Sequence, residues 1–313
     1  MFASLKRFLC WLDDLAEVLV FHVLFSRANW KKTTVALLLA TLALTHGSTL
    51  PEKLAHVRPA QLITPASEYA NRGYEALLKG RRAEAIKNLE LAVARDPGKA
   101  LYMQRLGLAY LEAGQNDRAQ IALEKAYRLQ ASRTTLFYQG CVYQNMKLND
   151  VAIGYFKQVK SAQGKDALLA EPAASYEPVA NAKIGECYIR KGEYDLAIDT
   201  LTRTTQAYPS YPHAYFYLGI AHWEKGDLDR GVEQMFKVIE LYPAESAAYY
   251  NVACYYAIKG IPDLALVWLE KSFAAGFAQF RHIQTDHDLD SIRQLPQFGA
   301  MVAKYEKVLP HED

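Results

Sequence analysis

The chain has 313 residues, of which 51% are hydrophobic and 22% charged, so it can bury a folded core and is not an intrinsically disordered protein. Its net charge is +2, and the whole excess lies in residues 1–50, because the other 263 residues carry 31 charges of each sign. A nucleic-acid-binding protein normally has a basic surplus over its folded part, so this balance excludes that class and predicts no nucleic-acid partner.

The first predicted element is an amphipathic helix within residues 1–29. Phe2 and several leucines recur at helical spacing on one side, opposite Lys6, Asp13 and Glu17, as in helices that lie in a membrane interface. A soluble helix packed on the body or on a partner would show the same pattern. The apolar run 18–25 also leaves a second, shallow membrane element open.

Residues 30–50 are predicted to form a transmembrane signal-anchor segment. Residues 33–50 carry no formal charge if His46 is neutral, and as a helix they extend roughly 27 Å, close to the ~30 Å hydrocarbon layer. An aromatic residue and two cations suited to lipid headgroups precede the leucines, and the anchor residues are Trp30, Lys31, Lys32, Leu37, Leu38, Leu39, Leu42 and Leu44. A cleavable signal peptide is the alternative, because the apolar centre is short and Gly47 and Ser48 follow it.

The cations are distributed unequally around the uncharged stretch 33–50, since five precede it and only Lys53 and Arg58 follow closely. This bias predicts a single-pass membrane protein with its N-terminus in the cytoplasm and the remaining chain extracytoplasmic, which means periplasmic in a bacterium. A cytoplasm-facing peripheral membrane protein is the alternative, and signal cleavage would give a secreted protein. Residues 51–65, which contain three prolines, are predicted to be a linker.

A sequence repeat occupies most of the remaining chain. Small residues recur at intervals of 34, 33, 45, 34 and 34 residues, at Gly73, Gly107, Gly140, Gly185, Gly219 and Ala253. Sixteen residues after each of them stands a bulky apolar side chain, namely Leu89, Leu123, Phe156, Leu201, Met235 or Leu269. Small residues let antiparallel helices approach closely and bulky ones fill the space between hairpins, so the pattern predicts stacked helical hairpins.

Segments such as LYMQRLGLAYLEAGQNDRAQIALEKAYRL carry this pattern, and in them the chain resembles the tetratricopeptide repeat family. The resemblance covers residues 66–277 and implies an all-α, right-handed superhelical solenoid of six helical hairpins, preceded here by the N-terminal membrane-associated helices. An insertion at 161–177 is either a tolerated surface loop or a hinge or partner-contact loop. Residues 278–313 resemble the end-of-group segment of some bacterial arrays, through an Asp-rich turn and the residues Pro296 and Phe298, which implies a C-terminal cap.

The sequence contains no pattern of catalytic or metal-ligating residues. The acidic cluster at 286–290 resembles a metal loop, but an EF-hand starting there would require glycine at Ser291 and glutamate at Gln297, so helix capping explains it better. Metal-ligand spacing is also absent among the cysteines, which are interpreted as structural free thiols: Cys10, Cys141, Cys187 and Cys254. Without a phosphate loop, zinc-protease helix or nucleophile elbow, the chain is predicted not to be an enzyme and to need no cofactor, metal or small-molecule substrate.

The resemblance also implies a binding surface, because in this family the first helix of each hairpin lines a concave groove. Carrying the ligand-facing offsets of the family onto this chain gives Tyr74, Leu78, Leu108, Phe137, Ile189, Arg190, Phe216, Ile220, Trp223 and Tyr250. The sites that form a Lys/Asn/Arg carboxylate clamp in chaperone-binding members are mostly apolar or aromatic here. An amphipathic helix or extended peptide is therefore the expected ligand, and burial of these side chains by the superhelical curl is the alternative.

Together these elements predict a membrane-tethered scaffold or assembly adaptor that captures a segment of a protein partner in its groove. Tethering raises the local concentration of membrane-bound partners, so the expected partners are subunits of a membrane complex and, at the N-terminus, membrane lipid. The alternative is a permanent structural subunit of a multiprotein membrane complex, bound through its N-terminal helices.

Overall fold

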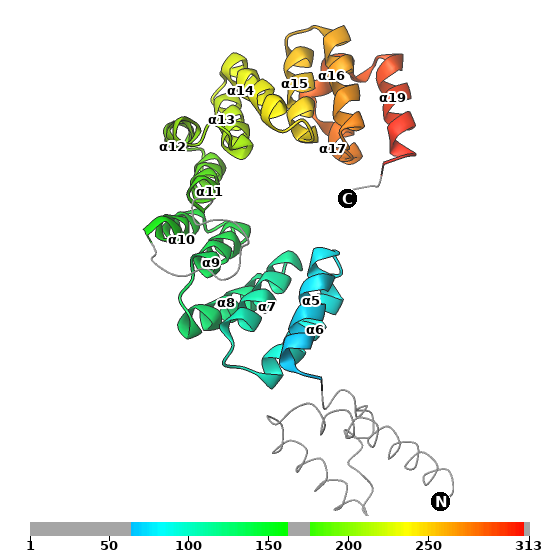
Figure 1. Cartoon of the computed structure of the whole chain (residues 1–313). Helices are drawn as coiled ribbons and strands as arrows, with labels where there is room; N and C mark the ends of the chain where they lie inside the picture. Colours follow the sequence, from blue (N-terminus) through cyan, green and yellow to red (C-terminus); the bar gives the residue numbers. More distant parts are fainter. Residues whose placement is uncertain (1–63, 162–175, 310–313) are drawn as a thin grey trace, which may run out of the picture.

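The computed structural model describes residues 64–161 and 176–309, and within these ranges all regular secondary structure is helical (Figure 1). The predicted interfacial helix, the anchor, nearly all of the linker and most of the insertion lie outside the described residues. Among the helices of the described ranges, none combines the length and apolarity needed to cross a membrane.

Consecutive helices pair into antiparallel hairpins, and each hairpin packs against the next. This arrangement confirms the predicted all-α solenoid of stacked hairpins. The hairpins in the described ranges are α5 (Ala66–Leu78) with α6 (Arg82–Arg95), α7 (Ala100–Glu112) with α8 (Asn116–Leu129), α9 (Arg133–Asn145) with α10 (Asn149–Ser161), α11 (Tyr176–Arg190) with α12 (Tyr194–Ala207), α13 (Pro212–Glu224) with α14 (Leu228–Leu241), and α15 (Ser246–Ile258) with α16 (Pro262–Ala274).

The hairpins follow a C-shaped path, which Figure 1 shows running from α5 at one end to the C-terminal helices at the other. Successive first helices contact one another directly, α5 with α7, α7 with α9, α9 with α11 and α11 with α13. In the middle of the C these first helices lie on the inner side of the curve, and their partners α10, α12 and α14 lie on the outer side (Figure 1). The inner, concave surface is therefore built from first helices.

The recurring small residues allow the two helices of a hairpin to pack closely. A Cβ atom built on Gly107 would lie 2.6 Å from Cγ of Leu123, and one on Gly185 would lie 2.6 Å from Cγ of Leu201. Both leucines are fully buried. Alanine at either glycine would therefore require the leucine to move, which explains the spacing of small and bulky residues in the sequence.

Tight turns with positive φ join the two helices of each hairpin. Glycine occupies this position in five hairpins of the described ranges, with φ between 68° and 89°, at Gly80, Gly114, Gly192, Gly226 and Gly260. In the third hairpin the residue is Lys147, with φ of 62°. A side chain in this left-handed conformation costs roughly 1–2 kcal/mol relative to the right-handed one.

Short helices after α16 cover the end of the last hairpin. They are α17 (Phe280–Thr285), the 3₁₀ helix η2 (His287–Leu289), α18 (Asp290–Arg293) and α19 (Pro296–Glu306). Ile283, Leu289 and Ile292 from these helices are fully buried in one core with Phe273 of α16 and Phe298 of α19. The apolar edge that a stacked hairpin would otherwise expose is thereby removed from water.

Candidate functional site

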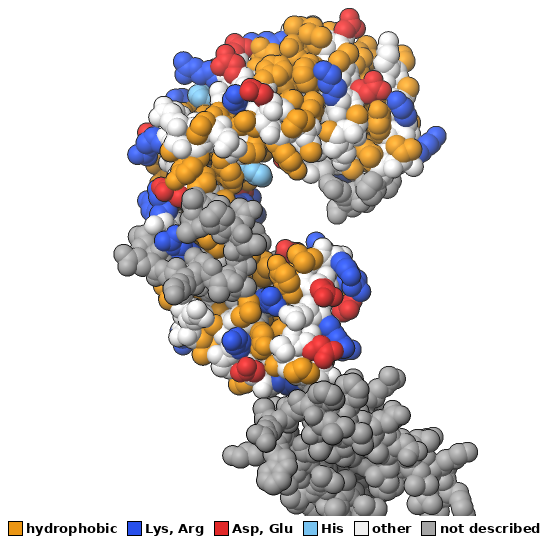
Figure 2. All heavy atoms as spheres, viewed as in Figure 1, with side chains coloured by type: hydrophobic (Ala, Val, Ile, Leu, Met, Phe, Trp, Pro, Cys, Tyr) orange, Lys and Arg blue, Asp and Glu red, His pale blue; other side chains and the backbone are white. Residues whose placement is uncertain are grey.

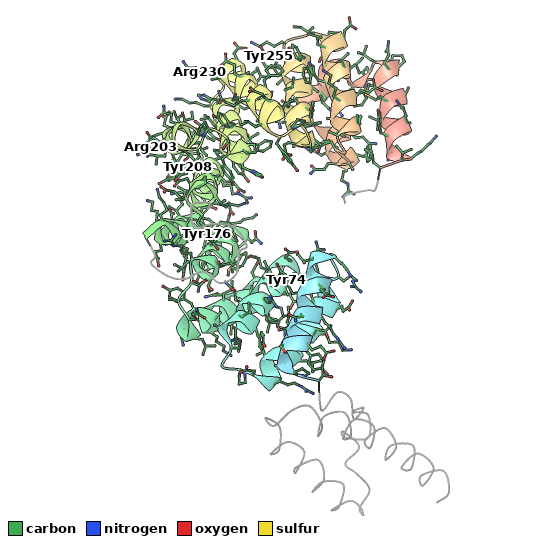
Figure 3. The ribbon with its side chains drawn as sticks, in the orientation of Figure 1. Tyr74, Tyr176, Arg203, Tyr208, Arg230 and Tyr255 are labelled. Carbon is green, nitrogen blue, oxygen red and sulfur yellow. The ribbon has the colours of Figure 1, made fainter. Side chains whose placement is uncertain are left out.

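The concave surface of the C carries the candidate site. Apolar side chains border the hollow on both arms, with charged groups between them (Figure 2). Tyr74 of α5 lies beside this hollow, whereas Arg203 of α12 and Arg230 of α14 lie on the outer side of the curve (Figure 3). The predicted groove residue Tyr74 thus lies on a different face from these side chains of the outer helices.

The N-terminal part of the groove is apolar and partly exposed. Tyr74 and Leu108 are half-buried against the core of the first two hairpins, together with Tyr138. Leu78, at the end of α5, leaves 71% of its surface exposed. Phe137 is half-buried and packs in the third hairpin, where its ring centroid lies 5.6 Å from that of Phe156. These side chains are accessible to an apolar ligand. Leu78 contributes least to the stability of the fold, because it is the most exposed of them.

A charged network occupies the middle of the groove. Glu186 of α11 is buried and accepts hydrogen bonds from Nζ of Lys183 at 2.8 Å and from Nη2 and Nε of Arg190 at 2.7 and 3.1 Å. Burial acts to raise the pKa of Glu186, but Lys183, Arg190 and the Tyr217 hydroxyl outweigh it, so that this pKa is lowered. The predicted groove residue Arg190 is therefore ion-paired, and its neighbour Ile189 is half-buried against the core shared by the fourth and fifth hairpins.

The C-terminal part of the groove merges with the cap. Phe216 and Ile220 of α13 are half-buried against the core of the fifth and sixth hairpins. Trp223 packs on the core of the cap and hydrogen-bonds the side chain of Asp288. Tyr250 has only 5% of its surface exposed, because its ring stacks on the ring of Phe277 with centroids 4.4 Å apart. Among the ten predicted groove residues, Tyr250 therefore offers almost no surface to a ligand.

The acidic cluster is part of the junction between this groove and the cap. Asp286 accepts a hydrogen bond from the Tyr250 hydroxyl at 2.6 Å and another from the backbone N–H of Asp288 at 3.0 Å, which caps η2. The thiol of Cys254 and the carboxylates of Asp286 and Asp288 lie within 4.8 Å of one another. Asp286 therefore caps a helix, as the sequence predicts, whereas the carboxylate of Asp288 accepts a hydrogen bond from the side chain of Trp223.

Burial makes the described thiols poor nucleophiles. It raises the pKa of Cys141 to about 11 and that of Cys187 to about 12, and it raises the pKa of Cys254 well above its ordinary value. A thiol with such a pKa contains almost no thiolate at neutral pH, and the thiolate is the reactive form. These three cysteines therefore act as packing residues in the first helices α9, α11 and α15.

One groove residue was not predicted from the sequence. Arg105 of α7 places its guanidinium carbon 4.4 Å from the ring centroid of Tyr74. Its Nη1 donates to the carbonyl oxygen of Ala70 at 3.4 Å and to Oδ1 of Asn71 at 3.5 Å. The signal was a single cation among apolar residues in the segment ALYMQRLGLAY, at a repeat position that holds Lys183 in the fourth unit.

Comparison with known sequences and structures agrees with this architecture. Residues 183–246 and 100–133 match two family models that are both described as tetratricopeptide repeat. These segments are tetratricopeptide repeats. A search of curated proteins found no match to the sequence.

Several solved structures are similar to this chain. The crystal structure of PilW, described as a widely conserved type IV pilus biogenesis factor, is 17% identical, with a TM-score of 0.56 over 72% of this chain and 97% of PilW. A chain of the APC/C hetero-tetramer Cut9–Hcn1 is 16% identical, with a TM-score of 0.57 over 84% of this chain and 46% of its own length. The MamA crystal structure is 22% identical, with a TM-score of 0.45 over 58% of this chain and 94% of MamA. The first two similarities show the fold alone.

Proposed function

We propose that this protein is a membrane-tethered scaffold or assembly adaptor that captures a segment of a partner protein in its concave groove. The observation that carries the proposal is the row of accessible apolar and aromatic side chains on successive first helices, from Leu78 in the first hairpin to Phe216 and Ile220 in the fifth. Burying such a row requires an elongated ligand with apolar side chains, which an amphipathic helix or an extended peptide supplies.

Two further observations support binding over catalysis. The described thiols are buried or half-buried, which raises their pKa, and Lys183 and Arg190 in the middle of the groove form ion pairs with Glu186. Similar folds occur in PilW, which is described as a type IV pilus biogenesis factor, and in a chain of the Cut9–Hcn1 hetero-tetramer. Subunits of a membrane complex are the proposed partners of this chain.

The membrane tether in this proposal is based on the sequence of residues 30–50. The proposed topology places the N-terminus in the cytoplasm and the solenoid outside it, with the membrane lipid contacted by the apolar leucines of the anchor. Carbonate extraction of membranes containing the full chain tests this tether: the full-length protein should stay in the pellet, and a variant lacking residues 1–50 should move to the supernatant. Release of the full-length chain would refute an integral anchor.

The groove is tested most cleanly with Leu78→Ser. Because this side chain is 71% exposed, its replacement should leave the stability of the fold almost unchanged. Burial of a leucine by a partner contributes about 1.5–3 kcal/mol, so loss of this contact should weaken capture roughly tenfold or more. Val267→Ser on α16, where the side chain is 48% exposed, is the matched control on a second helix of a hairpin.

The measurement is quantitative co-purification from native membranes in mild detergent, with the three proteins tagged identically. Loss of the partner with Leu78→Ser and full recovery with Val267→Ser would support the groove, whereas equal recovery from both would refute it. Sub-stoichiometric capture supports an adaptor. Stoichiometric and detergent-stable recovery would instead indicate a permanent subunit of the complex.

A further inference from the structure

We infer that the captured segment carries an internal acidic side chain between apolar residues, and that Arg105 binds this carboxylate. The inference rests on the proposed function and specifies the kind of side chain that the ligand carries. It is drawn from the charge of Arg105, which forms no ion pair with the described residues.

Arg105 is half-buried and incompletely hydrogen-bonded. Its Nε is buried without an acceptor, and the two acceptors of its Nη1, on Ala70 and Asn71, lie at the long limit of hydrogen bonding. Burial lowers the pKa of Arg105, which means that its surroundings disfavour the charge. The ring of Tyr74 supports one face of the guanidinium, but an aromatic face replaces only part of the lost hydration. An incoming carboxylate would accept hydrogen bonds from the guanidinium and replace the remaining part of its lost hydration.

The two cations in the middle of the groove, Lys183 and Arg190, are already neutralised. Lys183 and Arg190 both form ion pairs with Glu186, at 2.8 and 2.7 Å. Arg105 forms no ion pair with any described residue. The next carboxylate on its own helix, Glu112, is seven residues along, which corresponds to roughly 10 Å of helix axis. Of these three cations, Arg105 is thus the one that lacks an acidic partner.

The surroundings of Arg105 indicate whether the bound carboxylate is a side chain or a chain terminus. Apolar surface continues on both sides of it, with Tyr74 and Leu78 on α5 and with Leu108 and Tyr138 towards α9. A chain that buries surface on both sides must run past the guanidinium, so its carboxylate belongs to an internal aspartate or glutamate and not to a chain terminus. A single guanidinium also matches a single carboxylate.

A peptide-display selection on the full chain in detergent tests this inference. We expect the enriched dodecapeptides to contain one aspartate or glutamate flanked by apolar residues. The strongest of them is then synthesised with a fluorescent label, together with a twin that has glutamine (or asparagine) at the acidic position. Affinities of both peptides are measured by fluorescence anisotropy for wild type, Arg105→Gln, Arg105→Lys and the control Arg203→Gln on the outer helix α12.

The acidic peptide should bind wild type and Arg203→Gln roughly tenfold more tightly than its neutral twin, as a charge-assisted contact provides. Arg105→Gln should abolish this difference while leaving the affinity of the neutral twin almost unchanged, and Arg105→Lys, which keeps the charge and is the less disruptive change, should retain part of it. Circular dichroism checks that each variant is folded.

Two outcomes would overturn the inference: enrichment of neutral or terminally recognised peptides, or an acid preference that survives Arg105→Gln. In either case the proposed function stands if binding is still lost with Leu78→Ser. Failure to enrich any peptide, or binding that is indifferent to Leu78→Ser, would instead refute the proposed function itself.

Discussion

Replacing Gly107 by alanine tests whether close contact between the two helices of a hairpin holds the repeat together. The added Cβ would lie 2.6 Å from Cγ and 2.7 Å from Cδ2 of Leu123, which is fully buried. Leu123 must move to accept it, and overpacking of this kind costs about 1–3 kcal/mol. Alanine also favours the helix over glycine by roughly 0.5–1 kcal/mol, so the net destabilisation is expected to lie between about 0 and 2.5 kcal/mol.

Gly154 of α10 provides a matched control. It is also a helical glycine, but a Cβ built on it meets no atom within 4 Å. Gly154→Ala should therefore stabilise the protein by roughly 0.5–1 kcal/mol through the backbone term alone. The backbone contribution is common to both variants. The difference between their free energies of unfolding therefore measures the helix–helix contact alone, at about 1–3 kcal/mol.

A second substitution checks that Leu123 is the cause. Leu123→Ala alone should cost about 2–5 kcal/mol through the cavity it creates. In the double variant the methyl group of alanine at Gly107 no longer meets the leucine side chain and occupies part of that cavity. The double variant should therefore be less destabilised than the sum of the single variants, by about 1 kcal/mol or more.

The assay is hydrogen exchange of the full chain, followed by mass spectrometry, because the stability of stacked repeats is largely local. Opening free energies are read from the amides of α7 and α8 for the Gly107 and Leu123 variants and from α9 and α10 for Gly154→Ala. If Gly107→Ala and Gly154→Ala change stability alike, or if the double variant is strictly additive, the close contact does not have the proposed role.

Three further predictions concern polar groups and thiols. Tyr250→Phe removes the hydroxyl that donates to Asp286 and should cost roughly 1–3 kcal/mol, seen as faster hydrogen exchange in residues 280–306 while α7 is unchanged. The pKa of Glu186 is lowered in the folded protein, so its contribution to stability is present above the unfolded pKa of about 4.3 and is lost as the pH falls through the folded value. Glu186→Gln should therefore lower the urea midpoint at pH 7 and flatten its decline in acid, and parallel pH profiles would contradict this. Because burial raises the pKa of Cys141 to about 11 and of Cys187 to about 12, iodoacetamide should modify both slowly at pH 8 until the chain unfolds; mass mapping that finds rapid labelling of the folded protein would contradict this.

The sequence predicted the solenoid because the contacts that define a hairpin are short in sequence and recur. Gly107 meets Leu123 only sixteen residues later, and the same pair of residue types returns in the neighbouring units. One sequence pattern therefore specifies the described hairpins, and the tetratricopeptide repeat models confirm it over residues 100–133 and 183–246. The anchor at 30–50, the topology and the localisation stay predictions, because they concern residues outside the described ranges.

The groove was predicted less completely than the fold. A position in the repeat tells which face of a helix a residue occupies, but it does not tell whether another part of the chain covers that face. Tyr250 has a groove offset, but Asp286, 36 residues later, binds its hydroxyl, and the cap buries its ring. Trp223 is likewise engaged with Asp288 of the cap. Arg105 was missed because what distinguishes it is the absence of an ion-pair partner among the described residues. That absence depends on the three-dimensional structure and cannot be read from the pattern of residues along the chain.

The C-shaped path has a mechanical consequence for recognition. Each junction between hairpins sets a small rotation, and these rotations accumulate from α5 to α19, so the width of the opening depends on all the junctions together. A ligand that touches both arms would therefore bind best at one width. A substitution between two hairpins in the middle of the chain, far from any bound residue, would change affinity by changing that width, and the bound ligand would in turn stiffen the whole curve.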